Sequence, residues 1–350
     1  MRHILTSQRN IVMLGVKKMG KMINTVCGTV SSDDLGIVLA HEHIVFGFPG
    51  FQGDLTLGGF DREELVEGCV KQLNTLKQRY GLKTLVDATP NECGRDVLLL
   101  QEISRESSVN IICSTGYYIE AEGAPSYFNS RQNTCDVPTE IFEMFKEESY
   151  VGIEKTDVKA GVIKLCSGLG YISDYEKLFF HAAAKLARQD RNIRIITHTS
   201  EGTCAVEQAD LLILAGVHPA QIQIGHFCGC LDSKEQKAVL AKGVYVGFDR
   251  MGMDGFYGKP KDEVRYRSLM KLLDAGYEDR ILLSHDYCYF TYGRKTIPPR
   301  ENQDLINQWT WSHLFKKDLP NLRKMGVSEK QCEKFMKRNP SDFYGGRHID

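Results

Sequence analysis

The sequence predicts an α/β fold, a (β/α)8 TIM barrel, from its length, its pattern of apolar runs and the residues that follow the first run. The chain has 350 residues, of which 42% are hydrophobic and 25% charged, and one barrel accounts for this length. Eight short apolar, β-branched runs recur along it, and the segments between them are long enough for a helix. A doubly wound open sheet shows the same alternation, but it usually carries a glycine-rich phosphate loop after its first strand. This chain has His41-Glu42-His43 at that place, so the barrel is the better interpretation.

The predicted elements alternate as strand and helix. The strands are expected at residues 36–40, 83–87, 110–114, 161–165, 193–197, 222–225, 244–247 and 281–284. Amphipathic stretches predict helices at residues 62–79, 174–189, 204–215, 234–242 and 264–275. Upstream, the runs at 23–30 and 36–40 flank the turn-rich Ser31-Ser32-Asp33-Asp34, which predicts a short N-terminal β-hairpin leading into the first barrel strand. Further helices are expected at the C-terminus.

Residues 1–21 are expected to be a poorly ordered N-terminal extension, and residues 22–350 to form one barrel domain. The extension carries basic residues around a short apolar patch at 11–14, which is too short for the core of a signal peptide. No run approaches the roughly 20 apolar residues that span a bilayer. The net charge is −1 without a strong block of either sign, so we expect neither a nucleic-acid nor a membrane partner. The eleven cysteines are odd in number and lack a paired framework, which indicates a reducing, cytoplasmic location.

Polar side chains stand where the predicted strands end, and in such barrels the chemistry lies at the C-terminal strand ends. His41 and His43 end the first strand and share one face of it, while Glu42 points the opposite way and is expected to contact neighbouring elements. The side chain of His285 is likewise expected to face away from the site. Four more strands carry a metal-compatible group at or near their ends. These groups are Lys164, His198, His226 and Asp286.

This collection of side chains predicts a site for two metal ions. Four histidines, one carboxylate and one lysine exceed the ligands of one tetrahedral zinc, but they suit two ions that share a bridge. A lysine ammonium repels metals. Among apolar neighbours, however, its pKa falls, and the neutral amine of Lys164 can add carbon dioxide to form a carbamate whose two oxygens bridge two cations. A lysine that extends to the barrel rim and a Schiff-base aldolase are the alternatives for this residue.

The strand-end motifs together resemble those of the phosphotriesterase-like group of the amidohydrolase superfamily, whose members are binuclear metal hydrolases on a (β/α)8 barrel. The motifs occur in family order from about residue 22 to residue 345. They are Val26-Cys27-Gly28-Thr29-Val30, His41-Glu42-His43, Gly161-Val162-Ile163-Lys164, Thr197-His198-Thr199, Ile224-Gly225-His226, Gly247-Phe248-Asp249-Arg250, Ser284-His285-Asp286 and Asn339-Pro340.

The resemblance implies two divalent metal ions, zinc first among them, with manganese, cobalt or iron as alternatives. Carboxylated Lys164 would bridge the ions together with a water or hydroxide. Asp286 would accept the proton released when this hydroxide attacks, so Asp286 and Lys164 are the predicted catalytic residues. One ion would be held by His41, His43 and Asp286, and the other by His198 and His226.

Two further residues are predicted to contact the substrate. Tyr118, near the end of the third strand, resembles the family tyrosine that reaches toward the substrate, although Tyr117 competes for this assignment. Arg250, at the end of the seventh strand, resembles the lactonase-like members, whereas dedicated organophosphate hydrolases typically have histidine there. A structural ion pair with a nearby acid is the alternative for Arg250.

The primary prediction is a metal-dependent hydrolase of small-molecule lactones or related esters, which the resemblance suggests is a homodimer. A true phosphotriesterase and a non-catalytic metal- or ligand-binding barrel are the alternatives. The loops after strands seven and eight combine aromatic and basic residues, which favours sugar lactones that carry a phosphate or carboxylate, with solvated loop charge as the other interpretation. These loop residues are Met251, Asp254, Phe256, Tyr257, Lys259, Lys261, Tyr287, Tyr289, Phe290, Tyr292, Arg294 and Lys295.

Overall fold

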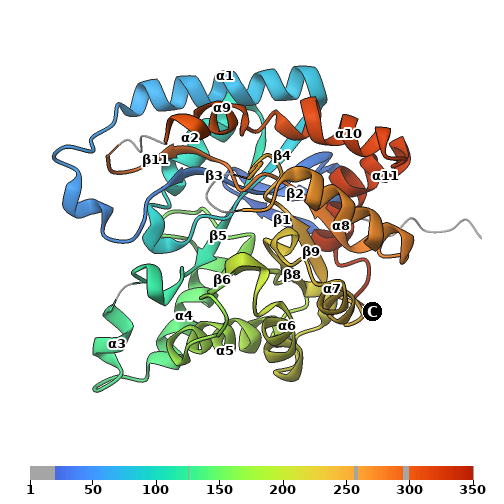
Figure 1. The fold of residues 1–350 in the computed structure, drawn as a ribbon. Helices are drawn as coiled ribbons and strands as arrows, with labels where there is room; N and C mark the ends of the chain where they lie inside the picture. Colours follow the sequence, from blue (N-terminus) through green and yellow to red (C-terminus); the bar gives the residue numbers. More distant parts are fainter. Residues whose placement is uncertain (1–19, 125, 256–258, 295–298, 350) are drawn as a thin grey trace, which may run out of the picture.

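Eight parallel strands of the described chain, β3 to β10, form the wall of a barrel in sequence order, and helices lie around it (Figure 1). The computed structural model describes residues 20–124, 126–255, 259–294 and 299–349. Each of the eight strands overlaps a predicted one, which confirms the (β/α)8 barrel. The strands are β3 (Ile37–Phe46), β4 (Leu82–Asp87), β5 (Asn110–Gly116), β6 (Val162–Ser167), β7 (Ile195–Thr199), β8 (Ile222–Ile224), β9 (Tyr245–Phe248) and β10 (Ile281–Leu283).

The helices follow the strands, and further helices lie at the C-terminus as predicted. Among the described residues, no helix is long and apolar enough to cross a membrane. Of the predicted N-terminal extension, residues 1–19 lie outside the described residues. The helices are α1 (Arg62–Tyr80), α2 (Val97–Ser107), α3 (Tyr127–Arg131), α4 (Val137–Tyr150), α5 (Asp174–Gln189), α6 (Ala205–Leu214), α7 (Ser233–Leu240), α8 (Asp262–Asp274), α9 (Gln303–Gln308), α10 (Leu319–Lys324), α11 (Glu329–Glu333) and α12 (Asn339–Gly345), with π-helical turns at Leu314–Asp318 and Lys334–Arg338.

The N-terminal hairpin exists, but its predicted turn was wrong. Strands β1 (Met22–Thr25) and β2 (Gly28–Ser31) pair antiparallel, with Thr25 opposite Gly28. Gly28 has a φ of +107°, a conformation that glycine adopts at little cost, so the chain reverses there. The polar stretch from Ser31 to Asp34 instead forms a short helical turn in which Ser31 Oγ accepts from the Asp33 N–H. Serine and aspartate favour caps as much as hairpin turns, which is why composition alone misplaced the reversal.

The barrel closes between β10 and β3. The His41 N–H donates to Ser284 Oγ at 3.0 Å, and the Asp286 N–H donates to the His41 carbonyl at 3.1 Å. A ninth strand, β11 (Cys288–Thr291), follows Asp286 and pairs parallel with the second half of β3. Part of the loop predicted after strand eight is therefore a strand that fixes the end of β3.

A local irregularity in β3 determines which way the two strand-end histidines point. Val38 and Ala40 pack in a cluster with Val86, whereas Leu39 belongs to the other core cluster. Strict alternation would place His41 on the face of Leu39. The register with β4 shifts between Leu39 and Glu42, because three residues of β3 span two residues of β4. Such an extra residue changes the face of the side chains that follow it, and here it turns His41 toward the site.

Candidate metal centre

Asp286 lies between histidines from two sides of the barrel. Its Oδ1 is 3.2 Å from His43 Nε2 and 3.6 Å from His41 Nε2. Its Oδ2 is 3.7 Å from His226 Nε2. One carboxylate therefore contacts ligand atoms from β3 and from the end of β8.

The remaining predicted ligands join the same cluster. His198 Nδ1 is 3.0 Å from His226 Nε2. Lys164 Nζ is 2.9 Å from His41 Nε2. The structure thus brings together all six side chains that the sequence predicts as metal ligands, and all six are buried or nearly so.

Asp249 orients two of these histidines, and the sequence analysis assigned it no role. Its Oδ2 is 2.9 Å from His41 Nδ1, and its Oδ1 is 3.0 Å from His226 Nδ1. A carboxylate bonded to Nδ1 fixes the tautomer in which Nε2 is free to bind a metal. The available signal was its place at the end of β9, where an alternating strand puts Tyr245, Gly247 and Asp249 on one face.

Thr89 orients the third histidine of the group in the same way. The Thr89 hydroxyl donates its only hydrogen to the Val45 carbonyl at 2.9 Å, so it can only accept from His43 Nδ1, 2.8 Å away. This leaves Nε2 as the His43 nitrogen that faces Asp286 and could bind a metal. All three histidines that contact Asp286 have an outer oxygen at Nδ1 and turn Nε2 toward Asp286.

Burial sets the protonation of the centre. It lowers the pKa of Lys164, which favours the neutral amine that carbamate formation requires. It also lowers the pKa of His198 well below its ordinary value and that of His226 to about 3. Burial alone would raise the pKa of Asp286, but the polar and charged groups around it, including the Arg250 guanidinium that donates to it, hold that pKa well below its usual range. Neutral imidazoles, a neutral amine and an ionised carboxylate are the forms in which these groups ligate metals.

Two of the six side chains stand on strained backbone. His226 has a φ of +55° and Asp286 a φ of +56°, the left-handed region that costs a non-glycine residue about 1–2 kcal/mol. The His226 N–H donates to Asp249 Oδ1 at 2.8 Å, which helps to hold this conformation. Strain of this kind at two predicted ligand positions indicates that the fold supports a site at the expense of local stability.

The two tyrosines that follow β5 point to different places. Tyr118 lies edge-on to His198, with ring centroids 5.5 Å apart, and lines the cavity over the centre. Tyr117 packs instead against Phe128 and Phe179, on the helical layer. The geometry therefore leaves Tyr118 as the tyrosine that faces the site.

Arg250 also faces the site and contacts its carboxylate. Its Nε donates to Asp286 Oδ2 at 3.0 Å, and its side chain is nearly buried. The acid of the alternative ion-pair interpretation is thus Asp286 itself. Arg250 therefore belongs to the centre whether it contacts the substrate or serves as a structural ion pair.

A cavity of about 700 Å³ lies over the centre. Its polar floor consists of Arg250 and five of the six converging side chains, all but the fully buried His41, and its other walls are mainly apolar. They come from the end of β3, from the loops after β9 and β10, and from α9 and the residue that follows it. They include Phe46, Phe48, Met253, Tyr287, Ile306 and Trp309.

Most loop residues predicted to shape the pocket serve other contacts. Tyr289 stacks on Trp311, and Tyr292 stacks on Phe51. Among the basic residues, Arg294 pairs with Asp54 and Lys259 with Glu201. Phe256, Tyr257 and Lys295 lie outside the described residues.

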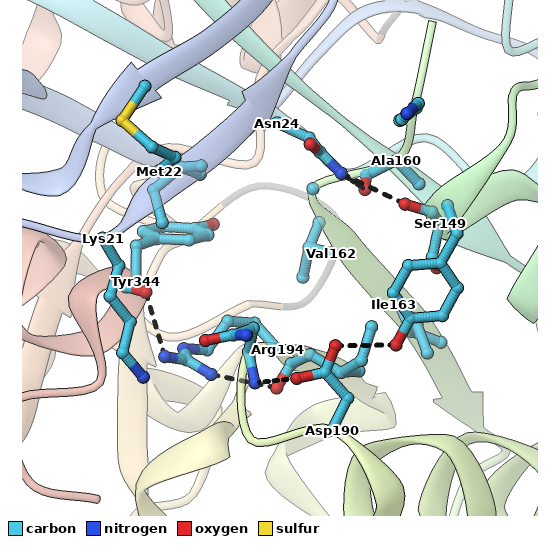
Figure 2. A pocket seen from close by; sticks show the side chains of 16 residues that line it. Lys21, Met22, Asn24, Ser149, Ala160, Val162, Ile163, Asp190, Arg194 and Tyr344 are labelled. Carbon is cyan, nitrogen blue, oxygen red and sulfur yellow. Dashed lines mark hydrogen bonds between the residues drawn. The ribbon is translucent and has the colours of Figure 1, made fainter.

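A second cavity, of about 440 Å³, lies at the opposite end of the barrel, beside the N-terminal hairpin and the starts of β6 and β7 (Figure 2). Its buried cation, Arg194, donates to the carbonyls of Phe343 and Tyr344 at the end of α12. Arg194 also bonds to the carbonyls of Arg191 and Ile193. These polar contacts connect chain segments to one another, so the candidate site is the cavity at the other end.

Comparisons with known proteins agree with this geometry. The family model of the phosphotriesterase family matches residues 21–344. Aryldialkylphosphatase from Saccharolobus solfataricus is 32% identical over 319 residues, which are 90% of this chain and 97% of that protein. The structure of an organophosphorus hydrolase from Deinococcus radiodurans is similar with a TM-score of 0.90 and 40% identity, covering 94% of this chain and 98% of that one. A mutant of a PTE-like lactonase from the same organism gives a TM-score of 0.89 and 41% identity, covering 92% and 99%.

The family match covers nearly all of the described chain, and its solved relatives share the barrel closely. The side chains that carried the resemblance meet at one strand-end site. This chain is therefore a hydrolase of the phosphotriesterase family.

Proposed function

We propose that this hydrolase is a lactonase that uses two divalent metal ions, zinc first among them, and that it prefers lactones with an apolar substituent. One observation carries the proposal. Six metal-compatible side chains converge at one end of the barrel, and five of them form the floor of a cavity whose other walls are mainly apolar.

The donor set fits two ions. His41, His43 and Asp286 offer ligand atoms that all lie within 4.8 Å of one another. His198 and His226 would hold the second ion. Imidazole nitrogens and carboxylate oxygens suit zinc, manganese, cobalt and iron. The neutral amine of buried Lys164, as a carbamate, would supply one oxygen to each ion.

The chemistry that such a pair supplies when bound is a deprotonated water near neutral pH and polarisation of the substrate carbonyl. Asp286 is the group that we assign to proton transfer, because its carboxylate contacts both halves of the donor set and is held ionised. Arg250 donates to Asp286 through Nε and has further N–H groups with which it would orient a carbonyl oxygen. Tyr118 lines the same cavity and would contact the ring of the lactone.

The surroundings of the centre favour an apolar substituent over a charged one. Phe48 and Trp309 are among the cavity walls. Arg294 and Lys259, which the sequence analysis considered for binding a phosphate or carboxylate, are each paired with an acidic residue. A phosphorylated sugar lactone would have to displace these partners, whereas an alkyl or acyl chain would be buried on contact with the walls.

We place the enzyme in a reducing compartment as a homodimer. All eleven cysteines are free, which supports the cytoplasmic location expected from their number. The dimer follows from the resemblance and is tested by the mass of the protein in solution.

A substrate panel with metal analysis tests the proposal. The purified protein is reconstituted with Zn²⁺, Mn²⁺ or Co²⁺ and assayed on lactones with alkyl chains of increasing length, on phosphorylated sugar lactones and on a phosphotriester. We expect about two metals per chain, and kcat/KM that rises with chain length and exceeds the phosphotriester value. The Asp286→Asn variant controls for background hydrolysis.

Each other outcome has a defined meaning. A preference for phosphorylated lactones would overturn the apolar substrate class. Phosphotriester turnover above that of every lactone would favour a true phosphotriesterase. Two bound metals without turnover of any ester would favour a non-catalytic metal-binding barrel.

A further inference from the structure

The carboxylate of Glu42 is fully buried and takes no part in the chemistry described above. It stands between His41 and His43 in β3, after the register shift that turns these histidines toward the site. Its side chain points away from theirs, as the alternation of a strand predicts. A buried, ionisable group at this place needs partners, and they identify what it does.

Glu42 accepts four hydrogen bonds from one short segment. Its Oε1 accepts from Ser284 Oγ at 2.6 Å and from both the N–H and the Nδ1 of His285, at 3.0 and 2.7 Å. Its Oε2 accepts from the Tyr287 N–H at 3.0 Å. These donors lie immediately before and immediately after Asp286. One carboxylate therefore fixes the chain on both sides of the assigned proton acceptor.

Asp286 needs this support because its backbone is left-handed, with a φ of +56°. The other left-handed member of the centre, His226, has a similar arrangement. Asp249, from the end of the neighbouring strand β9, accepts the His226 N–H at 2.8 Å. Each strained residue is thus held by a buried carboxylate from an adjacent strand, Asp249 in one case and Glu42 in the other.

The same hydrogen bonds continue to the wall of the substrate cavity. His285 Nε2 accepts from the Leu314 N–H at 3.0 Å, so Nδ1 carries the hydrogen that faces Glu42. Trp309 donates from Nε1 to the His285 carbonyl at 2.9 Å, and its ring lines the cavity. Glu42 therefore connects the position of Asp286 with the position of a cavity wall.

We propose that Glu42 is a positioning residue that holds Asp286 in the orientation required for metal ligation and proton transfer. The proposal rests on the role of Asp286 in the proposed function. A carboxylate that only stabilised the fold would leave the properties of Asp286 unchanged once the protein is folded.

Glu42→Gln is the direct test, because glutamine keeps the size but presents an NH₂ group where a backbone N–H needs an acceptor. We expect kcat to fall about 10- to 100-fold, with KM changed less than about threefold. In titrations of the metal-free protein with Co²⁺ against a competing chelator, the affinity for one of the two ions should fall about tenfold, because Asp286 is assigned to one ion. Wild-type kcat together with two wild-type Co²⁺ affinities would overturn the proposal.

Glu176→Gln is the matched control. Glu176 is also a buried carboxylate that accepts backbone N–H groups, from Gly168, Ser173 and Glu120 in other loops. We expect a lower Tm but kcat and both Co²⁺ affinities within about threefold of wild type. If Glu176→Gln reproduces the losses of Glu42→Gln, general destabilisation explains both and the proposal fails.

A second pair of variants keeps the test available if Glu42→Gln does not fold. His285→Asn retains a donor toward Glu42, whereas His285→Leu removes it, and both lose the acceptor for the Leu314 N–H. We expect a larger loss of kcat and of Co²⁺ affinity in His285→Leu, and equal losses would count against the proposal. The Co²⁺ titrations need no substrate, so they test Glu42 even if the wild type proves inactive on every lactone, a result that would instead refute the proposed function.

Discussion

Both ends of the barrel hold a cavity beside a buried basic side chain, but the two cavities differ in what their polar atoms contact. At the carboxyl-terminal end, Lys164 lies 2.9 Å from a histidine nitrogen, among other side-chain nitrogens and oxygens. At the amino-terminal end, Arg194 donates to four backbone carbonyls. Asn24 donates there to the carbonyls of Ser149 and Ala160 (Figure 2). Tyr150 donates there to Asp190 at 2.7 Å.

The two cavities differ in whether their polar atoms remain available to bind a ligand. Around Arg194, the polar side chains donate hydrogen bonds to backbone carbonyls that would otherwise be unpaired. These hydrogen bonds contribute to the stability of the fold. Around Lys164, outer partners such as Asp249 and Thr89 occupy the far nitrogens of the histidines and leave the near ones free. Substitutions at the two ends should therefore separate activity from stability.

Removing the central carboxylate should have the largest effect. In Asp286→Asn, kcat should fall about 10³-fold, because the variant loses the oxygen that we assign to metal binding and to proton transfer. Metal content and circular dichroism establish that the folded state persists. Turnover near the wild-type rate would refute the assignment of Asp286.

The next effect concerns Asp249, which orients two histidines from outside the centre. An asparagine has one oxygen, so Asp249→Asn can serve His41 or His226 but not both. We expect a 10- to 100-fold loss of metal affinity, measured by chelator competition. Unchanged affinity would show that the two tautomers are set in another way.

A smaller effect is expected at Arg250. Arg250→Lys keeps the charge but loses the planar fork, so kcat/KM for lactones should fall about tenfold. Assays on one lactone and one phosphotriester show whether the loss is specific to the carbonyl substrate. If Arg250→Lys and the wild type have equal kcat/KM for the lactone, Arg250 serves only as the ion-pair partner of Asp286.

Arg194 provides the opposite case at the other end of the barrel. In Arg194→Met, several carbonyls lose their donor, and the free energy of unfolding should fall by about 2 kcal/mol. The kcat/KM of the folded protein should remain that of the wild type. Denaturant unfolding with parallel assays checks both, and a specific loss of activity would mean that the two ends are coupled.

The smallest effect concerns pH. Burial raises the pKa of Glu92, which accepts the Tyr118 N–H, to about 7. The pKa of Glu92 is higher in the folded protein than in the unfolded chain, so protonated Glu92 stabilises the fold. This contribution to the free energy of unfolding is fully present below about pH 4.5 and is lost as pH rises through about 7. Glu92→Gln should reduce this fall in stability. Unfolding measured from pH 5 to pH 8 gives the two slopes, and identical slopes would contradict the prediction.

The parts of the fold that follow from local pattern were predicted well. Apolar runs of β-branched residues located all eight barrel strands, and α5 matches its predicted limits because a capping box at Ser173 defines its start. The hairpin turn was misplaced because Ser31 and its neighbours suit a capped turn as well as a reversal. β11 was missed because its residues read as an aromatic loop.

In the candidate site, too, the features that follow from local sequence were predicted, and those that depend on distant contacts were not. Six ligand-type residues could be named because histidine, aspartate and a lone apolar-strand lysine stand out at strand ends. Asp249 was quoted within a motif but given no role, since its two partners lie 208 and 23 residues away in the chain. The choice between Tyr117 and Tyr118 depended on packing against α5 and His198, which no local pattern encodes.

By itself, the sequence determined the barrel, the strand ends and the residue types of the centre, because strand periodicity and ligand chemistry are local properties. Only the tertiary structure decided how these residues meet. The extra residue in β3 turns His41 inward, the left-handed conformations aim His226 and Asp286, and Glu42 and Asp249 hold them there. These features arise from contacts between strands far apart in the chain, where the energy that offsets local strain is supplied.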